Sequence, residues 1–353
     1  MNTSKRTGFI RSRVVQLHPT LRCNLSCSHC YSSSGPRRDG ELKPGVLLKM
    51  LERLRSEGYD VASFSGGEPI MYRGLTEVAR GARDLGYRNV MISNGLLLSP
   101  RRLDAIAEHV DRIAVSLDGL GRTHDRLRGE GTFDRTVASL ARLRERRIEF
   151  GISHCVTRDS VADLPDMMSL CVESGASLLQ LHPLTRIGRA SVTPGLTPLG
   201  PVDLSRVYLL SRLLEAQAEG EVVVQFDAPH VADVLAQQDS YGVLRSGTNE
   251  RESLSDLVNP LIVDEAGSLW PLAYGMAPDQ CIARAPVASW EAQLDAYRRG
   301  RGAPLRALLR EVIDRLEPDG FVDWYGAVVG QSWERHRRVE SSELVQLKTA
   351  AGS

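Results

Sequence analysis

The chain has 353 residues, and its 44 Lys plus Arg residues balance its 44 Asp plus Glu residues, so the formal net charge is zero. This balance argues against binding nucleic acid or an anionic membrane through bulk electrostatics, and we expect neither partner. The length suits one large α/β domain or about two domains. No apolar run is long enough to span a bilayer, and the basic residues 1–13 lack the apolar core of a secretory signal, so we expect a cytoplasmic protein.

The first half of the chain alternates short runs rich in Val, Ile and Leu with amphipathic helical patterns. The predicted strands cover residues 13–17, 61–64, 89–92, 112–115, 149–156 and 177–181. The predicted helices between them cover residues 44–57, 75–85, 100–109, 132–144 and 163–174. Strand–helix units in series imply parallel strands, and six units favour a partial barrel or an open sheet over a closed barrel. In each of these folds, chemistry takes place at the carboxyl ends of the strands.

A change in composition follows Arg189. A stretch rich in Pro and Gly over residues 190–201 is typical of a linker. It is followed by a predicted helix (203–218), strand (222–226), helix (230–236), hairpin (261–264 with 268–270) and two helices (290–299 and 304–316). Residues after about 338 are polar, and we expect a frayed tail.

Three cysteines, Cys23, Cys27 and Cys30, crowd into eight positions directly after the first predicted strand. Three thiolates on one loop can hold a single metal centre. One interpretation is a structural zinc ion, with His18 or His29 as the fourth ligand. The other is a 4Fe–4S cluster that leaves one iron open for a further ligand. The spacing alone does not choose between them.

The residues that follow the next strands supply the context. Tyr31 comes directly after the cysteine array, and the next three predicted strands end in Ser65-Gly66-Gly67-Glu68-Pro69, Ser93-Asn94-Gly95 and Ser116-Leu117-Asp118-Gly119. Small residues at these ends allow a cofactor to approach the backbone closely. Each motif is weak alone, but their joint order is much more specific.

These motifs together resemble the radical S-adenosylmethionine superfamily over about residues 13–190, and His124-Asp125-Arg126-Leu127-Arg128-Gly129 with Thr132-Phe133 resembles its arm of peptide-modifying maturases. The resemblance implies an α/β fold with a partial (β/α)6 barrel and a smaller C-terminal α+β extension. The expected divisions are an N-terminal segment (1–12), the barrel core (13–190), a linker with helical and strand segments (191–260), the extension (261–338) and a tail (339–353).

The resemblance also implies roles for individual residues. Cys23, Cys27 and Cys30 would hold one 4Fe–4S cluster, whose open iron binds S-adenosylmethionine. The expected contacts of that molecule are Tyr31 near the adenine, Gly66, Gly67 and Glu68 at the methionine amine, Ser93, Asn94, Ser116 and Asp118 along the ribose and carboxylate side, and Arg128 at the carboxylate. A flavodoxin- or ferredoxin-type partner would supply the electron that cleaves the sulfonium and yields a 5′-deoxyadenosyl radical.

The sequence departs from the superfamily pattern in its last third. Residues 261–272 resemble the start of a SPASM/twitch-type extension, yet the cysteine expected near Leu272 is absent, and only Cys281 lies beyond the barrel. One thiolate cannot hold an auxiliary cluster, which favours a redox-neutral reaction or a transfer. The predicted function is modification of a ribosomal peptide or another natural-product precursor by hydrogen-atom abstraction. The alternatives are a small-molecule radical enzyme, including adenosyl or aminocarboxypropyl transfer, and a non-catalytic zinc-stabilised binding module.

Three further residues are candidates for catalysis. His182 ends the sixth predicted strand on the side where chemistry is expected, and could contact the substrate. Asp227 follows the strand at 222–226 and could accept a proton. Cys281 could return a hydrogen atom to a substrate radical, although a lone cysteine usually serves packing.

Overall fold

The computed structural model describes residues 12–237, 253–284, 286–300 and 302–350. Most of the predicted N-terminal segment, residues 238–252 of the predicted 191–260 segment and residues 351–353 of the predicted tail lie outside the described residues. No helix in the described ranges combines the length and the apolar character needed to cross a membrane.

The described strands form one sheet of nine. They are β1 (Val14–Leu17), β2 (Val61–Phe64), β3 (Arg88–Ser93), β4 (Arg112–Ser116), β5 (Phe150–Val156), β6 (Leu178–Pro183), β7 (Val223–Phe226), β8 (Leu261–Val263) and β9 (Leu269–Pro271). Their order across the sheet is β7-β6-β5-β4-β3-β2-β1-β8-β9. All neighbours are parallel except the antiparallel pair β8–β9, so the carboxyl ends of β1 to β8 share one edge.

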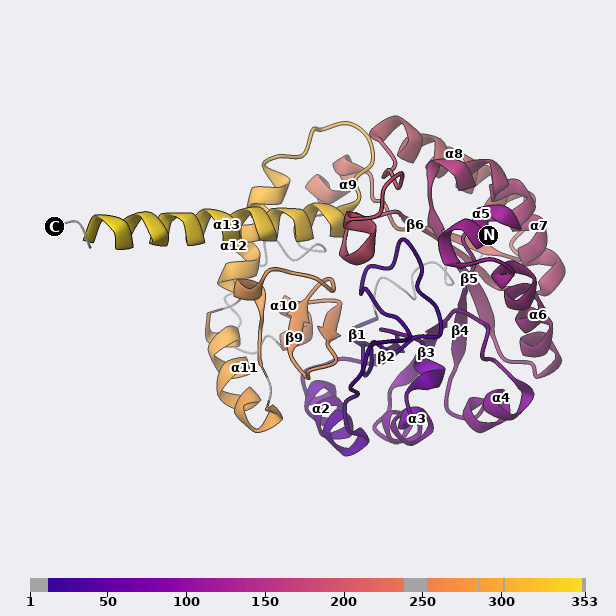
Figure 1. Ribbon diagram of the computed structural model, residues 1–353, viewed down its shortest axis with the longest axis horizontal. Helices are drawn as coiled ribbons and strands as arrows, with labels where there is room; N and C mark the ends of the chain where they lie inside the picture. The colour runs from indigo at the N-terminus through magenta and orange to yellow at the C-terminus, as the bar shows by residue number, and fades with distance from the viewer. Residues whose placement is uncertain (1–11, 238–252, 285, 301, 351–353) are drawn as a thin grey trace.

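The described helices connect these strands or, from α11 onward, follow the last of them. They are α2 (Pro44–Ser56), α3 (Leu75–Asp84), α4 (Pro100–Ile106), α5 (Arg122–Arg128), α6 (Thr132–Glu145), α7 (Leu164–Ser174), α8 (Pro201–Gln217), α9 (Val231–Ala236), α10 (Leu254–Leu257), α11 (Trp290–Arg299), α12 (Ala303–Ile313) and α13 (Trp324–Ala350). In Figure 1 the helices α2, α3, α4, α6 and α7 form an arc outside the strands, while α13 projects away from that arc.

Helix α2 shows how the sequence produces this layer. Pro44 occupies the first turn, where the missing N–H costs no helical hydrogen bond. Leu47, Met50, Leu51 and Leu54 recur at helical spacing and are fully buried. Since burying one such side chain contributes about 1.5–3 kcal/mol, this apolar stripe fixes the face that α2 turns toward the sheet.

The predicted fold class is confirmed: the strands and crossover helices of a partial barrel are present, together with a C-terminal extension. The predicted hairpin is also confirmed, with Ile262 opposite Trp270. Two features were not predicted. Strand β8 pairs in parallel with β1, so the extension continues the barrel sheet. Helix α13 continues to Ala350, where a tail from residue 339 was expected. The domain boundaries themselves stay a prediction.

A buried carboxylate joins the barrel to the extension. Glu57, at the end of α2, is 1% exposed. Its oxygens lie 2.7 Å from Arg53 Nη1 and 3.0 Å from Arg298 Nη1 of α11, and accept the N–H of Leu254 of α10 at 2.9 Å. Because α10 and α11 belong to the C-terminal part of the chain, this one carboxylate connects the two ends of the fold.

We predict that Glu57→Ala lowers the free energy of unfolding by about 2–3 kcal/mol, because it removes the shared partner of Arg53 and Arg298 and leaves the N–H of Leu254 without its acceptor. The matched control is Glu52→Ala, at an exposed position of the same helix, which should change it by less than about 0.5 kcal/mol. Urea unfolding followed by circular dichroism measures both. Equal effects of the two substitutions would show that Glu57 does not connect the two parts.

Candidate active site

The cysteine loop follows β1 and lies against the end of β2. Backbone N–H groups of Gly67 and Glu68 donate to the carbonyls of Thr20 at 2.8 Å and Arg22 at 3.0 Å. A Cβ on Gly67 would lie 2.2 Å from the Arg22 carbonyl oxygen, and one on Gly66, where φ is +94°, would lie 2.8 Å from that of Thr20. Only glycine permits this approach, so the Gly-Gly pair fixes where the cysteine loop begins.

The three thiols of this loop are near enough to interact electrostatically. Cys23 is nearly buried, Cys27 and Cys30 are half-buried, and all are free thiols. Burial raises the pKa of Cys23 to about 12, and repulsion from the other two thiols acts in the same direction. Burial also raises the pKa of Cys27, which the Arg128 guanidinium opposes. Bare thiolates are therefore disfavoured here, and a bound cationic centre would be needed to hold the sulfurs ionised.

The candidate fourth ligands for a single metal ion beside the thiols are His18 and His29. Among the described residues, no group of three or more His, Cys, Asp or Glu side chains is placed to hold a single metal ion. His29 Nε2 lies 3.1 Å from Asp118, and the ring of His18 stacks on Tyr274 at 4.8 Å, so each histidine already contacts another side chain. Thiolates that each bind a different iron of a cluster need not converge on one point.

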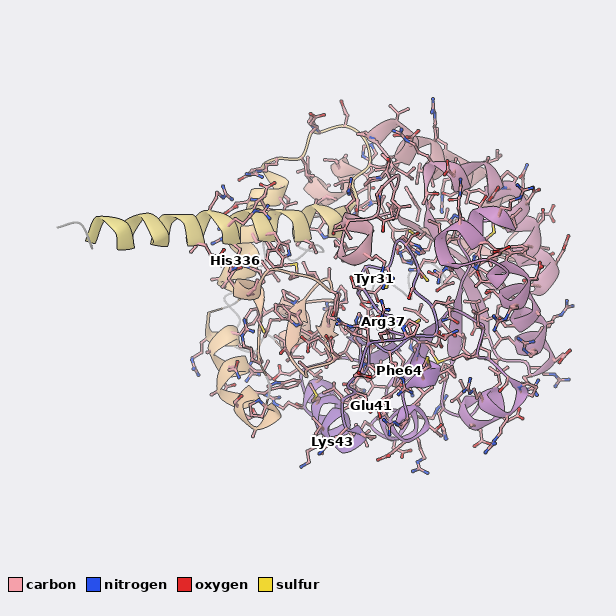
Figure 2. The ribbon with its side chains drawn as sticks, in the orientation of Figure 1. Tyr31, Arg37, Glu41, Lys43, Phe64 and His336 are labelled. Atoms are coloured by element: carbon pink, nitrogen blue, oxygen red, sulfur yellow. The ribbon has the colours of Figure 1, made fainter. Side chains whose placement is uncertain are left out.

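Unpartnered polar atoms remain beside the loop. The Nδ1 atoms of His18 and His29 are buried without a hydrogen-bond partner in the described structure. Tyr31 lies on the same loop, inside the arc of helices in Figure 2, and its hydroxyl is 3.0 Å from Ser65 Oγ and 3.4 Å from His18 Nε2. A buried polar atom left alone is costly, so a polar ligand beside the loop would satisfy these two nitrogens.

Glu68 connects the ends of β2 and β3. Its buried carboxylate accepts hydrogen bonds from Ser93 Oγ at 2.9 Å, from the Asn94 N–H at 2.8 Å and from the Ile70 N–H at 3.3 Å. Burial raises its pKa even though these donors oppose the shift. Asn94 in turn donates from Nδ2 toward Cys23 Sγ at 3.7 Å. The structure thus brings the predicted residues Glu68, Ser93 and Asn94 together beside the first cysteine.

Asp118 is a second buried carboxylate, at the end of β4. Its Oδ2 lies 2.5 Å from Arg128 Nε of α5 and 3.1 Å from His29 Nε2, and its Oδ1 accepts the N–H of Cys155 at 2.9 Å. Burial opposes its charge, but the Arg128 guanidinium and His29 hold its pKa well below the usual range. No bond is recorded in the described structure for the terminal nitrogens of Arg128, which leaves them available to a carboxylate. Ser116 lies two residues before Asp118, at the end of β4.

A second polar group lies at the ends of β6 and β7. His182 Nδ1 is 2.6 Å from Asp227 Oδ2, and the amide nitrogens of Gln180 and Gln225 donate to the same carboxylate at 2.9 and 2.7 Å. The sequence analysis selected His182 and Asp227 separately; the structure joins them. The His182 side chain is 40% exposed, and its contact with Asp227 is made through Nδ1, not Nε2.

Cys281 lies apart from this pair. Its thiol contacts the carbonyls of Leu269 at 3.6 Å and Ala283 at 3.5 Å, beside β9, at the opposite end of the strand order from β6 and β7. Two contacts of the cysteine loop were missed by the sequence analysis: the His29–Asp118 pair and hydrogen bonds from Arg189. The position of His29 inside the cysteine array was the only sequence signal for its contact with Asp118. No sequence feature indicated the hydrogen bonds from Arg189.

Comparisons with known proteins agree with this geometry. Residues 17–171 match the Radical SAM superfamily. An AdoMet-dependent heme synthase of Methanosarcina barkeri is 31% identical over 231 residues, which cover 64% of this chain and 65% of that protein. The sporulation killing factor maturation protein SkfB of Bacillus subtilis is 29% identical over 178 residues, covering 50% and 43%. This chain therefore spans less than two thirds of the length of these curated relatives.

A solved structure of SuiB from Streptococcus suis bound to S-adenosylmethionine has a TM-score of 0.66 at 15% identity, covering 84% of this chain and 68% of SuiB. At that identity the similarity shows the fold. The predicted cofactors, a 4Fe–4S cluster and S-adenosylmethionine, are those of the superfamily. The match to the Radical SAM superfamily thus lies in residues 17–171, and the similarity to the heme synthase and to SkfB is what this chain shares with curated proteins.

Proposed function

We propose that this chain cleaves S-adenosylmethionine reductively and modifies a ribosomal peptide or another natural-product precursor by hydrogen-atom abstraction. Cys23, Cys27 and Cys30 would hold the 4Fe–4S cluster, which supplies the electron that releases a 5′-deoxyadenosyl radical. The observation that carries the proposal is the three-thiol loop, which the ends of β2, β3 and β4 surround with buried, internally paired carboxylates.

The chain's own residues bind and orient the cosubstrate in this proposal. Arg128, fixed through Nε by Asp118, presents its terminal nitrogens to the methionine carboxylate. Tyr31 would contact the adenine, and the backbone of Gly66 and Gly67 with the carboxylate of Glu68 would bind the methionine amine. Asn94, Ser93 and Ser116 line the ribose side. Because each carboxylate is already hydrogen-bonded, the site is pre-organised and needs little rearrangement to receive a ligand.

His182 and Asp227 serve the substrate side in the same proposal. The carboxylate of Asp227 already accepts three donors, so it acts as a positioning residue for His182 and not as a free base. His182 Nε2 is left to exchange a proton with the substrate. Cys281 as a hydrogen-atom donor stays a prediction, and product stereochemistry in Cys281→Ala tests it.

The substrate class rests on relatives. The name of SkfB describes maturation of a killing factor, which supports a peptide precursor. The second candidate is a small-molecule substrate, and it is favoured by the heme synthase, whose match extends over 231 residues compared with 178 for SkfB. We also propose a flavodoxin- or ferredoxin-type reductant and a cytoplasmic setting, where free thiols persist.

We predict that anaerobically reconstituted protein binds iron and sulfide and releases 5′-deoxyadenosine from S-adenosylmethionine and dithionite, whereas Cys27→Ser does neither. Cys171→Ser is the matched control, since this thiol is buried in the core and burial raises its pKa to about 12. Metal analysis and chromatography of the nucleoside products measure both. Zinc in place of iron, without nucleoside release, would support the binding-module alternative.

Arg128→Lys should weaken S-adenosylmethionine binding about tenfold or more, because a lysine cannot keep the Asp118 contact and still offer paired donors to a carboxylate. Calorimetric titration of the reconstituted protein measures the dissociation constant. Arg126→Lys is the control on the same helix, since Arg126 is exposed and pairs only with Asp159 at the surface. If the two variants bind equally well, Arg128 does not hold the ligand.

Asp227→Asn should lower the pKa of His182, which burial depresses and the carboxylate raises above the ordinary value in the wild type. A raised folded-state pKa means that the pair stabilises the fold fully below about pH 6.5 and loses that contribution as pH rises through the folded-state value. The stability difference between wild type and variant should therefore shrink at alkaline pH. Histidine NMR titration measures the pKa, and an unchanged value would contradict the pairing.

A further inference from the structure

The segment after β6 lies against the back of the cysteine loop. Gly188 has φ of +60°, and a Cβ there would lie 2.1 Å from the Tyr31 carbonyl oxygen. The next residue, Arg189, donates its backbone N–H to the Cys30 carbonyl at 2.9 Å. The two chain segments therefore touch backbone to backbone, more than 150 residues apart in sequence, at the third cysteine.

The guanidinium of Arg189 spans the same loop. Nη1 donates to the Cys27 carbonyl at 2.6 Å, and Nη2 donates to the Ser34 carbonyl at 2.6 Å. Thr193 adds a hydroxyl donor to the Ser28 carbonyl at 2.9 Å. These bonds hold carbonyls on both sides of Cys30, so they fix the path of the loop between its second and third thiols and beyond.

Arg189 is suited to this task by its charge and shape. The planar fork of a guanidinium reaches two carbonyls at once, and a charged donor makes stronger hydrogen bonds than a neutral one. No acidic side chain lies within ion-pair distance of Arg189 in the described part of the chain, so the carbonyls do not compete with a carboxylate. A loop that must keep three sulfurs in place needs such support, because irregular segments open more readily than strands or helices.

We propose that Arg189 is a positioning residue that clamps the cysteine loop through the carbonyls of Cys27, Cys30 and Ser34 and thereby slows loss of the bound cluster. This inference extends the proposed function, because it concerns how the loop holds its metal centre. It predicts a local effect on the thiols of the loop, and no effect on cysteines buried elsewhere.

The first test uses the protein without iron, so it does not depend on the proposed reaction. Alkylation of each cysteine by iodoacetamide is followed by mass spectrometry, with Cys171, which is fully buried, as the internal reference. Arg189→Ala should raise the rates of Cys27 and Cys30 about tenfold relative to Cys171, because each charge-assisted bond contributes that order of stabilisation to the closed loop. Arg189→Lys should fall between wild type and Arg189→Ala.

The second test uses the reconstituted protein. Anaerobic release of iron to a chelator should be about tenfold faster in Arg189→Ala than in wild type, by the same reasoning. The matched control in both tests is Arg186→Ala, since Arg186 is exposed in the same segment and donates to the Ser191 carbonyl, outside the cysteine loop. It should behave as wild type.

Each outcome decides the inference. If Arg189→Ala shows the same rate as wild type in the alkylation assay or in the iron-release assay, the clamp is contradicted. An equal rise in the alkylation rate of Cys171 also contradicts the clamp, because Arg189 would then stabilise the whole fold and not the loop. The Arg189→Lys variant repeats this comparison with a smaller perturbation. If wild-type protein binds no iron–sulfur cluster, the proposed function fails, while the alkylation test still decides whether Arg189 holds the loop.

Discussion

The structure depends on the close approach between the cysteine loop and the end of β2. Backbone hydrogen bonds from Gly67 and Glu68 to Thr20 and Arg22 leave no room for a Cβ at either glycine. This contact places the thiols at the edge where the parallel strands end, and it turns Glu68 inward to bind the end of β3. A larger side chain at these positions would separate the loop from the sheet, and the other contacts of the site would be lost with it.

Buried charge around the thiols is neutralised within the protein. Glu68 is surrounded by a hydroxyl and backbone N–H groups, and Asp118 by Arg128 and His29. A fixed set of paired groups of this kind keeps its geometry whether or not a ligand is present. The strand order separates two groups of residues: the ends of β1 to β4 lie beside the thiols, while β6 and β7 carry the His182–Asp227 pair.

Much of this arrangement could be predicted from the sequence, because it depends on local patterns. Helical spacing of Leu47, Met50, Leu51 and Leu54 indicated α2, and the cysteine spacing indicated a loop that brings three thiols into one segment. The contacts between distant segments could not be predicted. Arg189 is one arginine among many, and its position after β6 gives no sign that it faces the cysteines.

The same limit applies to Glu57 and to the extension. A glutamate at the end of an amphipathic helix is typical of a solvated surface, yet it is buried by arginines from α2 and α11. Strand β8 is too short to reveal its partner, and its parallel pairing with β1 follows only from the assembled sheet. His182 and Asp227 were each selected for their positions at strand ends, and their contact needed the β6–β7 register.

The central claim is that three thiolates leave one iron of the cluster open to the methionine end of S-adenosylmethionine. Electron–nuclear double resonance on the reduced, reconstituted protein tests this directly, using S-adenosylmethionine labelled with ¹⁵N at the amine and ¹⁷O at the carboxylate. The account predicts hyperfine coupling from both labels to the cluster. Absence of coupling from the labels, together with coupling from a histidine nitrogen, would show that a protein side chain fills that position and would contradict the account.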